Sequence, residues 1–210
     1  MLARKKRRRA PDLKLLQPEE RGKAMNKIVL TAQDLLEDSF KLGGAVLKAG
    51  FEPTLIVAIW RGGAPVGMAV QELIRHCGVE ADHIAIRTSS YLGPDQRKSE
   101  VAVFGLNYVV NKVSPDDRLL IVDDVFDTGN TIAAVIRELK EKARDNTPRE
   151  IKIAVPWYKP KRNETDITPD FWIHESDDWI VFPHELDALT LDEMKEARPA
   201  LYELFAPLKE

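Results

Sequence analysis

Cysteine is nearly absent from this sequence, and long apolar runs are missing. The single cysteine, Cys77, cannot form an internal disulfide framework. No apolar stretch approaches the roughly 20 residues that a membrane-spanning helix requires. The beginning of the chain also lacks the apolar core of a secretory signal peptide. These absences lead us to expect a cytoplasmic protein that does not cross or bind a membrane.

Charge is distributed unevenly. The net charge is −3, but residues 1–24 hold nine Lys or Arg and three Asp or Glu, which gives +6 there and leaves −9 on residues 25–210. We interpret residues 1–24 as a tail kept disordered by its own charge. A nucleic-acid-binding arm or a targeting tag is the alternative. The acidic body disfavours nucleic acid as a partner outside this tail, and we expect residues 25–210 to form one domain.

Strand and helix patterns alternate through this expected domain. Thr31 and Asp34 form a capping-box pattern before a helix. The apolar run RLLIV, residues 118–122, is typical of a strand covered on both faces. Residues 88–100 combine turn formers and charges without periodicity, so we expect a mobile loop. The expected strands are 54–60, 83–87, 118–122 and 150–157, and the expected helices are 32–48, a segment through 74, and 131–143.

This alternation predicts an α/β fold with a central, mostly parallel, twisted sheet flanked by helices. In such sheets, ligands bind beyond the carboxyl ends of the strands. The loops 61–67 and 123–130 each follow an expected strand directly. We therefore expect both loops to open on the same edge of the sheet.

The stretch LLIVDDVFDTGNT, residues 119–131, combines acids with a helix start. Unpaired N–H groups of a first helical turn, the helix dipole and the Thr128 and Thr131 hydroxyls suit a phosphate monoester. The lysine of a Walker P-loop is missing, which disfavours a nucleoside triphosphate. Asp123 and Asp124 can accept hydrogen bonds from hydroxyls or help to hold magnesium. A sugar phosphate offers both kinds of group.

Other interpretations of this stretch are weaker. An aspartic protease also carries the letters DTG, but it needs two copies on an all-β fold. An EF-hand fails because Val125 occupies a ligand position. A purely structural helix cap remains an alternative on the pattern alone. The four histidines show no metal-ligand spacing, and we expect them to be structural or exposed.

The stretch resembles the phosphoribosyl pyrophosphate motif of the type I phosphoribosyltransferases. The resemblance implies that Asp123 and Asp124 bind the ribose hydroxyls. It implies Mg²⁺ as cofactor, with Asp123, Asp124 and Glu185 as candidate ligands, directly or through water. Asp127 would be the catalytic acid or base, facing the purine N7. The residues implied to cradle the 5′-phosphate are Asp127, Thr128, Gly129, Asn130 and Thr131.

Two further segments resemble parts of the same family. IVAIWRGGAPVG, residues 56–67, is similar to its pyrophosphate loop, and the resemblance implies that Arg61, Gly62 and Gly63 bind the leaving group. It also implies a cis peptide bond between Trp60 and Arg61. A strand-to-helix turn with a solvated arginine is the alternative.

Ser89–Tyr91 resembles the Ser-Tyr pair in the flexible loop of hypoxanthine-guanine phosphoribosyltransferases. The resemblance implies that Ser90 and Tyr91 belong to a loop that closes over the reacting centre and excludes water. Ordinary loop residues are the alternative.

VPWYKP and DDWIVFPHE resemble segments of the 6-oxopurine enzymes. The resemblance implies that Lys159 donates to the purine 6-oxo group, that Trp179 stacks on the ring, and that the backbone of Ile180 contacts the exocyclic position. Stacking contributes about 0.5–1.5 kcal/mol beyond area burial. Trp172 competes for the stacking role, and a buried core position is the alternative for Trp179.

The implied reaction transfers the phosphoribosyl group to hypoxanthine, guanine or xanthine in purine salvage, and the sequence does not rank these bases. The resemblance also implies a homo-oligomer, dimer or tetramer. A regulator that binds nucleotide or RNA without turnover is the alternative, while Lys159 and Trp179 disfavour orotate or uracil as acceptor.

We expect a small hood from the C-terminal segment, with the purine-site segment at about 157–187 and a packing helix at about 190–206 that Pro199 interrupts.

Overall fold

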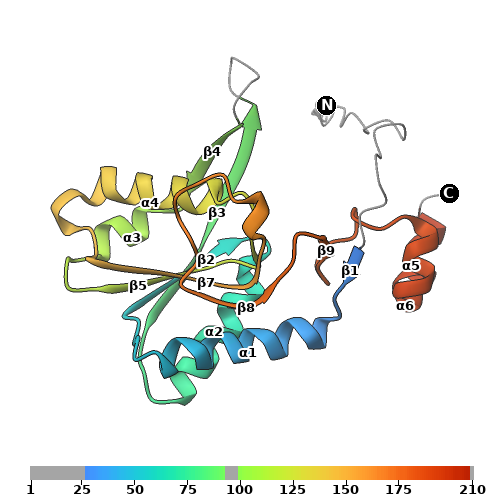
Figure 1. Cartoon of the computed structure of the whole chain (residues 1–210), viewed down its shortest axis with the longest axis horizontal. Coiled ribbons are helices and arrows are strands. Elements are labelled where there is room, and N and C mark those ends of the chain that lie inside the picture. Colours follow the sequence, from blue (N-terminus) through green and yellow to red (C-terminus); the bar gives the residue numbers. More distant parts are fainter. Residues whose placement is uncertain (1–26, 93–98, 209–210) are drawn as a thin grey trace, which may run out of the picture.

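The computed structural model describes residues 27–92 and 99–208, and the side chains within them except those of residues 90–92 and 99–100. The predicted tail, residues 1–24, lies outside the described residues. The fold is an α/β sheet flanked by helices, with a smaller group of elements at one end (Figure 1).

The strands are β1 (Lys27–Val29), β2 (Leu55–Trp60), β3 (Asp82–Leu92), β4 (Ser99–Phe104), β5 (Arg118–Val122), β6 (Val125–Phe126), β7 (Glu150–Tyr158), β8 (Phe171–Glu175) and β9 (Trp179–Val181). The helices are α1 (Ala32–Lys48), α2 (Gly63–His76), α3 (Asn107–Lys112), α4 (Asn130–Ala143), α5 (Leu191–Ala197) and α6 (Pro199–Phe205), with 3₁₀ turns at η2 (Arg144–Asn146), η3 (Pro160–Arg162) and η4 (Ala206–Leu208).

The main sheet has seven strands in the order β4-β3-β2-β5-β7-β6, with β8 also paired to β7. All of its pairs are parallel except β3 with β4. The mostly parallel sheet predicted from the sequence is therefore confirmed. Strand β5 shows why its apolar run is continuous: Leu119 and Ile121 face one core cluster, and Leu120 and Val122 face the other.

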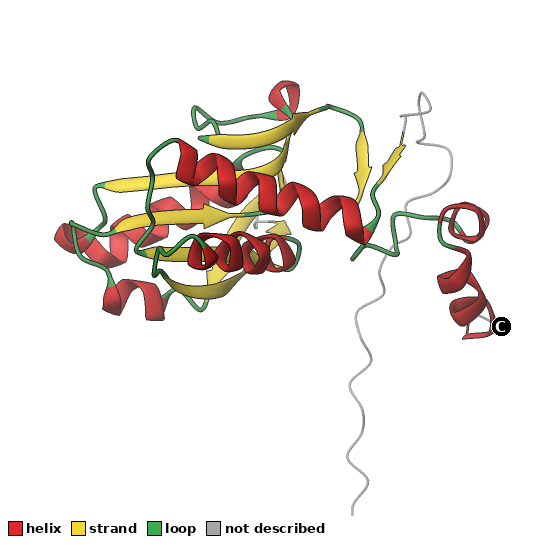
Figure 2. Cartoon of the chain, turned by 90° about the horizontal axis from the view of Figure 1, so that it is seen from below, coloured by secondary structure: helices red, strands yellow, loops and turns green. Residues whose placement is uncertain are grey.

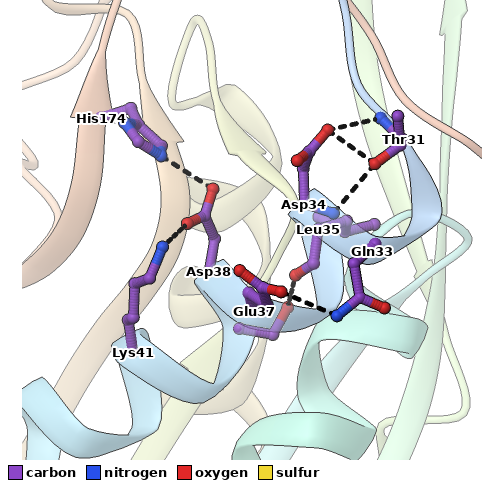
Figure 3. A network of polar contacts seen from close by, with 9 residues as sticks. Thr31, Gln33, Asp34, Leu35, Glu37, Asp38, Lys41 and His174 are labelled. Atoms are coloured by element: carbon purple, nitrogen blue, oxygen red, sulfur yellow. Dashed lines mark hydrogen bonds and ion pairs between the residues drawn. The ribbon is translucent and has the colours of Figure 1, made fainter.

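Helix α1 begins at the predicted capping box (Figure 3). The Asp34 N–H donates to Thr31 Oγ1 over 3.1 Å, and the Thr31 N–H donates to Asp34 Oδ2 over 3.0 Å. One turn later, the buried Asp38 accepts from Lys41 Nζ at 2.8 Å and lies 2.7 Å from His174 Nε2. Because His174 belongs to β8, this contact ties the edge of the sheet to α1.

The prediction of a loop at residues 88–100 is wrong at both ends of this range. Strand β3 continues to Leu92, and β4 begins at Ser99, with antiparallel pairing from Arg87 opposite Phe104 to Leu92 opposite Ser99. A strand stabilised by a partner strand does not need an apolar periodicity of its own, which is why the pattern missed it. Ser90 and Tyr91 lie in β3, and their side chains are outside the described ones.

The hood consists of β1, β9, α5 and α6, which lie together beside one end of the main sheet (Figures 1 and 2). β9 pairs in parallel with β1, and helices α5 and α6 pack around Val181, Leu189 and Met194. The sequence predicted a hood from the C-terminal segment alone and missed the contribution of β1. The predicted helix at 190–206 is interrupted before Pro199, as expected. Within the described part of the chain, no helix is long and apolar enough to cross a membrane.

Lys27 and Glu193 join the two ends of the hood. Lys27 Nζ lies 2.7 Å from Glu193 Oε1, and this lysine with the Thr190 backbone lowers the pKa of Glu193 to about 2. Because the folded pKa is depressed from 4.5, the stabilisation is present above pH 4.5 and is lost as the pH falls toward 2. Both side chains are partly exposed, so solvent screening limits the contribution to about 0.2–1 kcal/mol.

We therefore expect Glu193→Gln to lower the free energy of unfolding by about 0.2–1 kcal/mol at pH 7. Urea unfolding of both proteins at pH 7 and at successively lower pH measures the difference. The difference should shrink as the pH falls below 4.5. An equal difference at every pH would contradict this assignment.

Candidate functional site

The two loops predicted to open on one edge lie side by side. Strands β2 and β5 pair in parallel, with Ala58 opposite Val122, so the segments after them leave the sheet together. A Cβ built on Gly62 would lie 1.8 Å from Asp124 Oδ2, and one on Gly63 would lie 2.6 Å from the Val122 carbonyl oxygen. These distances leave no space for a side chain on either glycine. The predicted cis bond between Trp60 and Arg61 is present at this point.

Asp123 and Asp124 form an acid pair at the end of β5. The Asp124 N–H donates to Asp123 Oδ1 over 3.0 Å. Burial of the Asp123 carboxyl and, secondly, the neighbouring Asp124 charge raise the pKa of Asp123 well above its ordinary value. Two full negative charges are therefore costly here without hydroxyl donors or a cation. A ligand that supplies either group would stabilise the pair.

The predicted phosphate cradle leads from β6 into α4. Gly129 precedes the helix with φ +80°, a conformation that glycine adopts without steric cost. A Cβ there would also lie 2.5 Å from Thr165 Oγ1 and 2.9 Å from the Phe126 ring. The N–H groups of the first turn of α4 have no partner within the helix, so they can donate to an anion.

Asp127 lies between two cationic side chains. Lys159, which is only 8% exposed, places its Nζ 3.8 Å from Asp127 Oδ2. Arg162 of η3 pairs with Asp127 Oδ1. The Lys159 N–H donates to the Phe126 carbonyl over 2.9 Å, which fixes the end of β7 beside the cradle. The structure thus brings together the predicted purine-binding lysine and the predicted catalytic aspartate, and adds Arg162.

Trp179 and Trp172 have different surroundings. Trp172 is 39% exposed and packs against Tyr158 with ring centroids 5.6 Å apart. Trp179 is 47% exposed, so it is not a core aromatic. It lines a cavity of about 380 Å³ with Arg61, His184 and Glu185. Ile180 is buried in the core beneath, which leaves only its backbone to meet a ligand.

The predicted site residues do not all share one cavity. Among the described residues, the lining of the Trp179 cavity includes Arg61 and Glu185 but not Lys159 or Asp127. The described residues also contain no group of three or more His, Cys, Asp or Glu side chains placed to hold a metal ion. The carboxylates of Asp123, Asp124 and Glu185 are oxygen ligands of the kind Mg²⁺ prefers. They fit a hydrated ion held mainly by substrate oxygens, because Mg²⁺ usually keeps several waters.

Sequence reasoning missed two contacts of the segment after β9. His184 Nε2 lies 3.1 Å from Asp124 Oδ2. Arg198, between α5 and α6, donates to the carbonyls of Phe182 (2.9 Å), Pro183 (3.3 Å) and Glu185 (3.0 Å). Both contacts join residues that a local motif does not connect. In this segment the sequence pointed only to Glu185, the acidic residue that directly follows His184.

Comparisons with known proteins agree with this geometry. The family model described as phosphoribosyl transferase domain matches residues 28–189. The purine phosphoribosyltransferase of Pyrococcus horikoshii Ot3 is 27% identical, with a TM-score of 0.62 over 79% of this chain and 98% of that one. No curated protein sequence matches the chain.

Two further solved structures are less than 25% identical and show the fold alone. One is a hypothetical protein from Neisseria gonorrhoeae with bound ppGpp, at 23% identity and a TM-score of 0.67 over 85% of this chain and 99% of that one. The other is the xanthine-guanine-hypoxanthine phosphoribosyltransferase of Helicobacter pylori, at 20% identity and a TM-score of 0.60 over 78% of this chain and 96% of that one.

Proposed function

The chain belongs to the phosphoribosyl transferase domain family, and we propose that it transfers the phosphoribosyl group of phosphoribosyl pyrophosphate to a 6-oxopurine base. The observation that carries the choice of base is the buried Lys159 beside Asp127 at the cradle. An ammonium group can only donate hydrogen bonds, so it suits the 6-oxo group of hypoxanthine, guanine or xanthine and does not suit the 6-amino group of adenine.

The sugar phosphate would lie along the edge formed by the loops after β2 and β5. The acid pair would accept hydrogen bonds from the ribose hydroxyls, and the amides of the cradle would bind the 5′-phosphate. Arg61, with the amides of Gly62 and Gly63, would bind the departing pyrophosphate and stabilise its growing charge. Gly62 and Gly63 lie directly against the acid pair, so one ligand can reach both loops.

The base nitrogen N9 would form the new bond to C1′ of the ribose while the bond from C1′ to the pyrophosphate oxygen breaks. The two reactants must be held in line because the ribosyl centre becomes cationic as the leaving group departs. Asp127 would accept the proton from purine N7 or stabilise the positive charge there. Lys159 and Arg162 pair with this carboxylate and would hold it in place beside the base.

Mg²⁺ would supply charge neutralisation for the pyrophosphate oxygens. The candidate ligands are Asp123, Asp124 and Glu185, directly or through water. The raised pKa of Asp123 supports this assignment, since a divalent cation would offset the charge repulsion between Asp123 and Asp124.

A spectrophotometric screen of bases tests the proposal. With Mg²⁺ and phosphoribosyl pyrophosphate, we expect nucleotide formation with at least one of hypoxanthine, guanine and xanthine. Adenine, orotate and uracil should give no comparable rate. Turnover restricted to adenine or to a pyrimidine would contradict the assigned substrate class.

Trp179 is the better candidate for stacking on the base, because it lines the cavity with Arg61 while Trp172 packs on Tyr158. We expect Trp179→Ala to raise the KM for the purine about 2- to 12-fold, which corresponds to about 0.5–1.5 kcal/mol of stacking. Steady-state kinetics of Trp172→Ala provide the matched control, with little change expected. The opposite ranking of the two variants would reassign the stacking role.

A second candidate function is a regulator with this fold that binds nucleotide or RNA without turnover. The Neisseria gonorrhoeae protein of similar fold was solved with bound ppGpp, which makes ppGpp the nucleotide to test for this function. Equilibrium binding of ppGpp, together with pyrophosphate release in the presence of purines, separates the two functions. Salt-dependent RNA binding that disappears on removal of residues 1–24 would support an RNA role for the tail.

A further inference from the structure

His184 connects the hood to the acid pair. Its Nε2 lies 3.1 Å from Asp124 Oδ2, although the two residues are 60 positions apart in the sequence. Both side chains are largely buried, with 21% of the histidine and 13% of the aspartate exposed. A hydrogen bond to a charged group in such a place is stronger than one at the surface.

The ring of His184 is held by its own segment. It stacks on Phe182 with ring centroids 5.4 Å apart and an interplanar angle of 14°. The backbone on both sides of it is fixed by Arg198, which binds the carbonyls of Phe182, Pro183 and Glu185. The imidazole therefore reaches Asp124 from a fixed support.

The hydrogen bond has one direction. An ionised carboxylate only accepts, so the His184 ring must donate from Nε2. A neutral imidazole then leaves Nδ1 as an acceptor, and this buried atom has no partner among the described residues. The Asp124 carboxylate also lies against Gly62, where a Cβ would overlap it. The carboxylate therefore contacts both the hood, through His184, and the loop after β2, through Gly62.

We propose that His184 is a positioning residue that holds the Asp124 carboxylate in the orientation in which it accepts from a ribose hydroxyl. The inference rests on the proposed function, because it assumes that the acid pair binds phosphoribosyl pyrophosphate. It adds that the hood takes part in binding this substrate.

The same segment faces the cavity that contains Trp179 and Arg61. His184 and the next residue, Glu185, both line it. Trp179 is supported independently of the His184 ring, because its strand β9 is paired to β1. We therefore expect His184 to govern affinity for phosphoribosyl pyrophosphate and to leave affinity for the base nearly unchanged.

Two substitutions separate the hydrogen bond from the packing. His184→Phe keeps an aromatic ring for stacking on Phe182 but removes the donor. His184→Gln loses the ring but keeps an N–H donor of similar reach. His76→Phe, at an exposed position at the end of α2, is the control for introducing a phenylalanine. Calorimetry with phosphoribosyl pyrophosphate and Mg²⁺ gives affinities, steady-state kinetics give both KM values, and thermal unfolding shows that each variant is folded.

We expect His184→Phe to weaken phosphoribosyl pyrophosphate binding about tenfold, in line with the loss of a hydrogen bond to a charged group. The KM for the base should stay within about twofold, and His184→Gln should recover most of the affinity. Unchanged or tighter binding by His184→Phe would overturn the proposal, and so would a His184→Gln variant as weak as His184→Phe. If His184→Phe does not fold, His184→Ala replaces it as the variant without a donor, with the same expected loss of affinity. If His184→Gln does not fold, the affinity of His184→Phe decides. Absence of binding by the unaltered protein is a separate result that would overturn the proposed function itself.

Discussion

Gly62→Ala is expected to lower kcat/KM by about 100-fold, the scale of loss that a 1 Å misplacement of catalytic groups produces. The added Cβ would lie 1.8 Å from Asp124 Oδ2 and 2.3 Å from Asp124 Cγ, so the carboxylate must move. The same Oδ2 atom lies 3.1 Å from His184 Nε2, so moving it also disturbs that hydrogen bond. The displaced group is the end of a side chain and not backbone, so the damage should fall on ligand binding more than on folding.

Gly44→Ala is the matched control, because no atom lies within 4 Å of a Cβ at that position in α1. Alanine in a helix interior should stabilise the protein by about 0.5–1 kcal/mol relative to glycine. Steady-state kinetics and thermal unfolding of both variants make the comparison. If Gly62→Ala retains the activity of the unaltered protein, the acid pair does not bind the substrate in the way described.

Asp127→Asn is expected to reduce turnover by at least about tenfold, because general acid-base catalysis is typically worth about 10²–10⁴-fold in rate. The amide cannot take up a proton from the base, and it cancels the negative charge between Lys159 and Arg162. Binding of phosphoribosyl pyrophosphate should be largely kept, because the backbone N–H groups of the cradle remain.

Single-turnover kinetics and calorimetry of this variant measure the two quantities separately. Asp166→Asn removes an exposed carboxylate elsewhere in the segment after η3 and should change neither. Turnover equal to that of the unaltered protein would remove Asp127 from the chemistry. A loss of substrate affinity as large as the loss of turnover would reassign it to binding.

The parts of the site within one local motif could be predicted from the sequence. The acid pair, the cradle and the start of α4 are consecutive in the chain, so the apolar run of β5 and the turn at Gly129 were enough to place them. The shared edge of the loops after β2 and β5 followed from the rule that parallel strands end on one side. The central strands were clear because both of their faces are buried.

The contacts that the sequence missed all join distant segments. Arg162 reaches Asp127 across 35 positions, and His184 reaches Asp124 across 60. The pairing of β1 with β9 and the hairpin of β3 with β4 depend on partner strands and carry weak local patterns. Arg198 acts through backbone carbonyls, which have no sequence signature. Local propensity cannot identify such pairs, because tertiary contacts decide them.

Titration calorimetry of the full chain with phosphoribosyl pyrophosphate and Mg²⁺ tests the central claim most directly, namely that the acid pair and the cradle together bind this sugar phosphate. We expect saturable binding that is strongly weakened when Asp123 and Asp124 are both replaced with asparagine. Saturable binding of equal strength by that variant, or no binding by the unaltered protein, would contradict it.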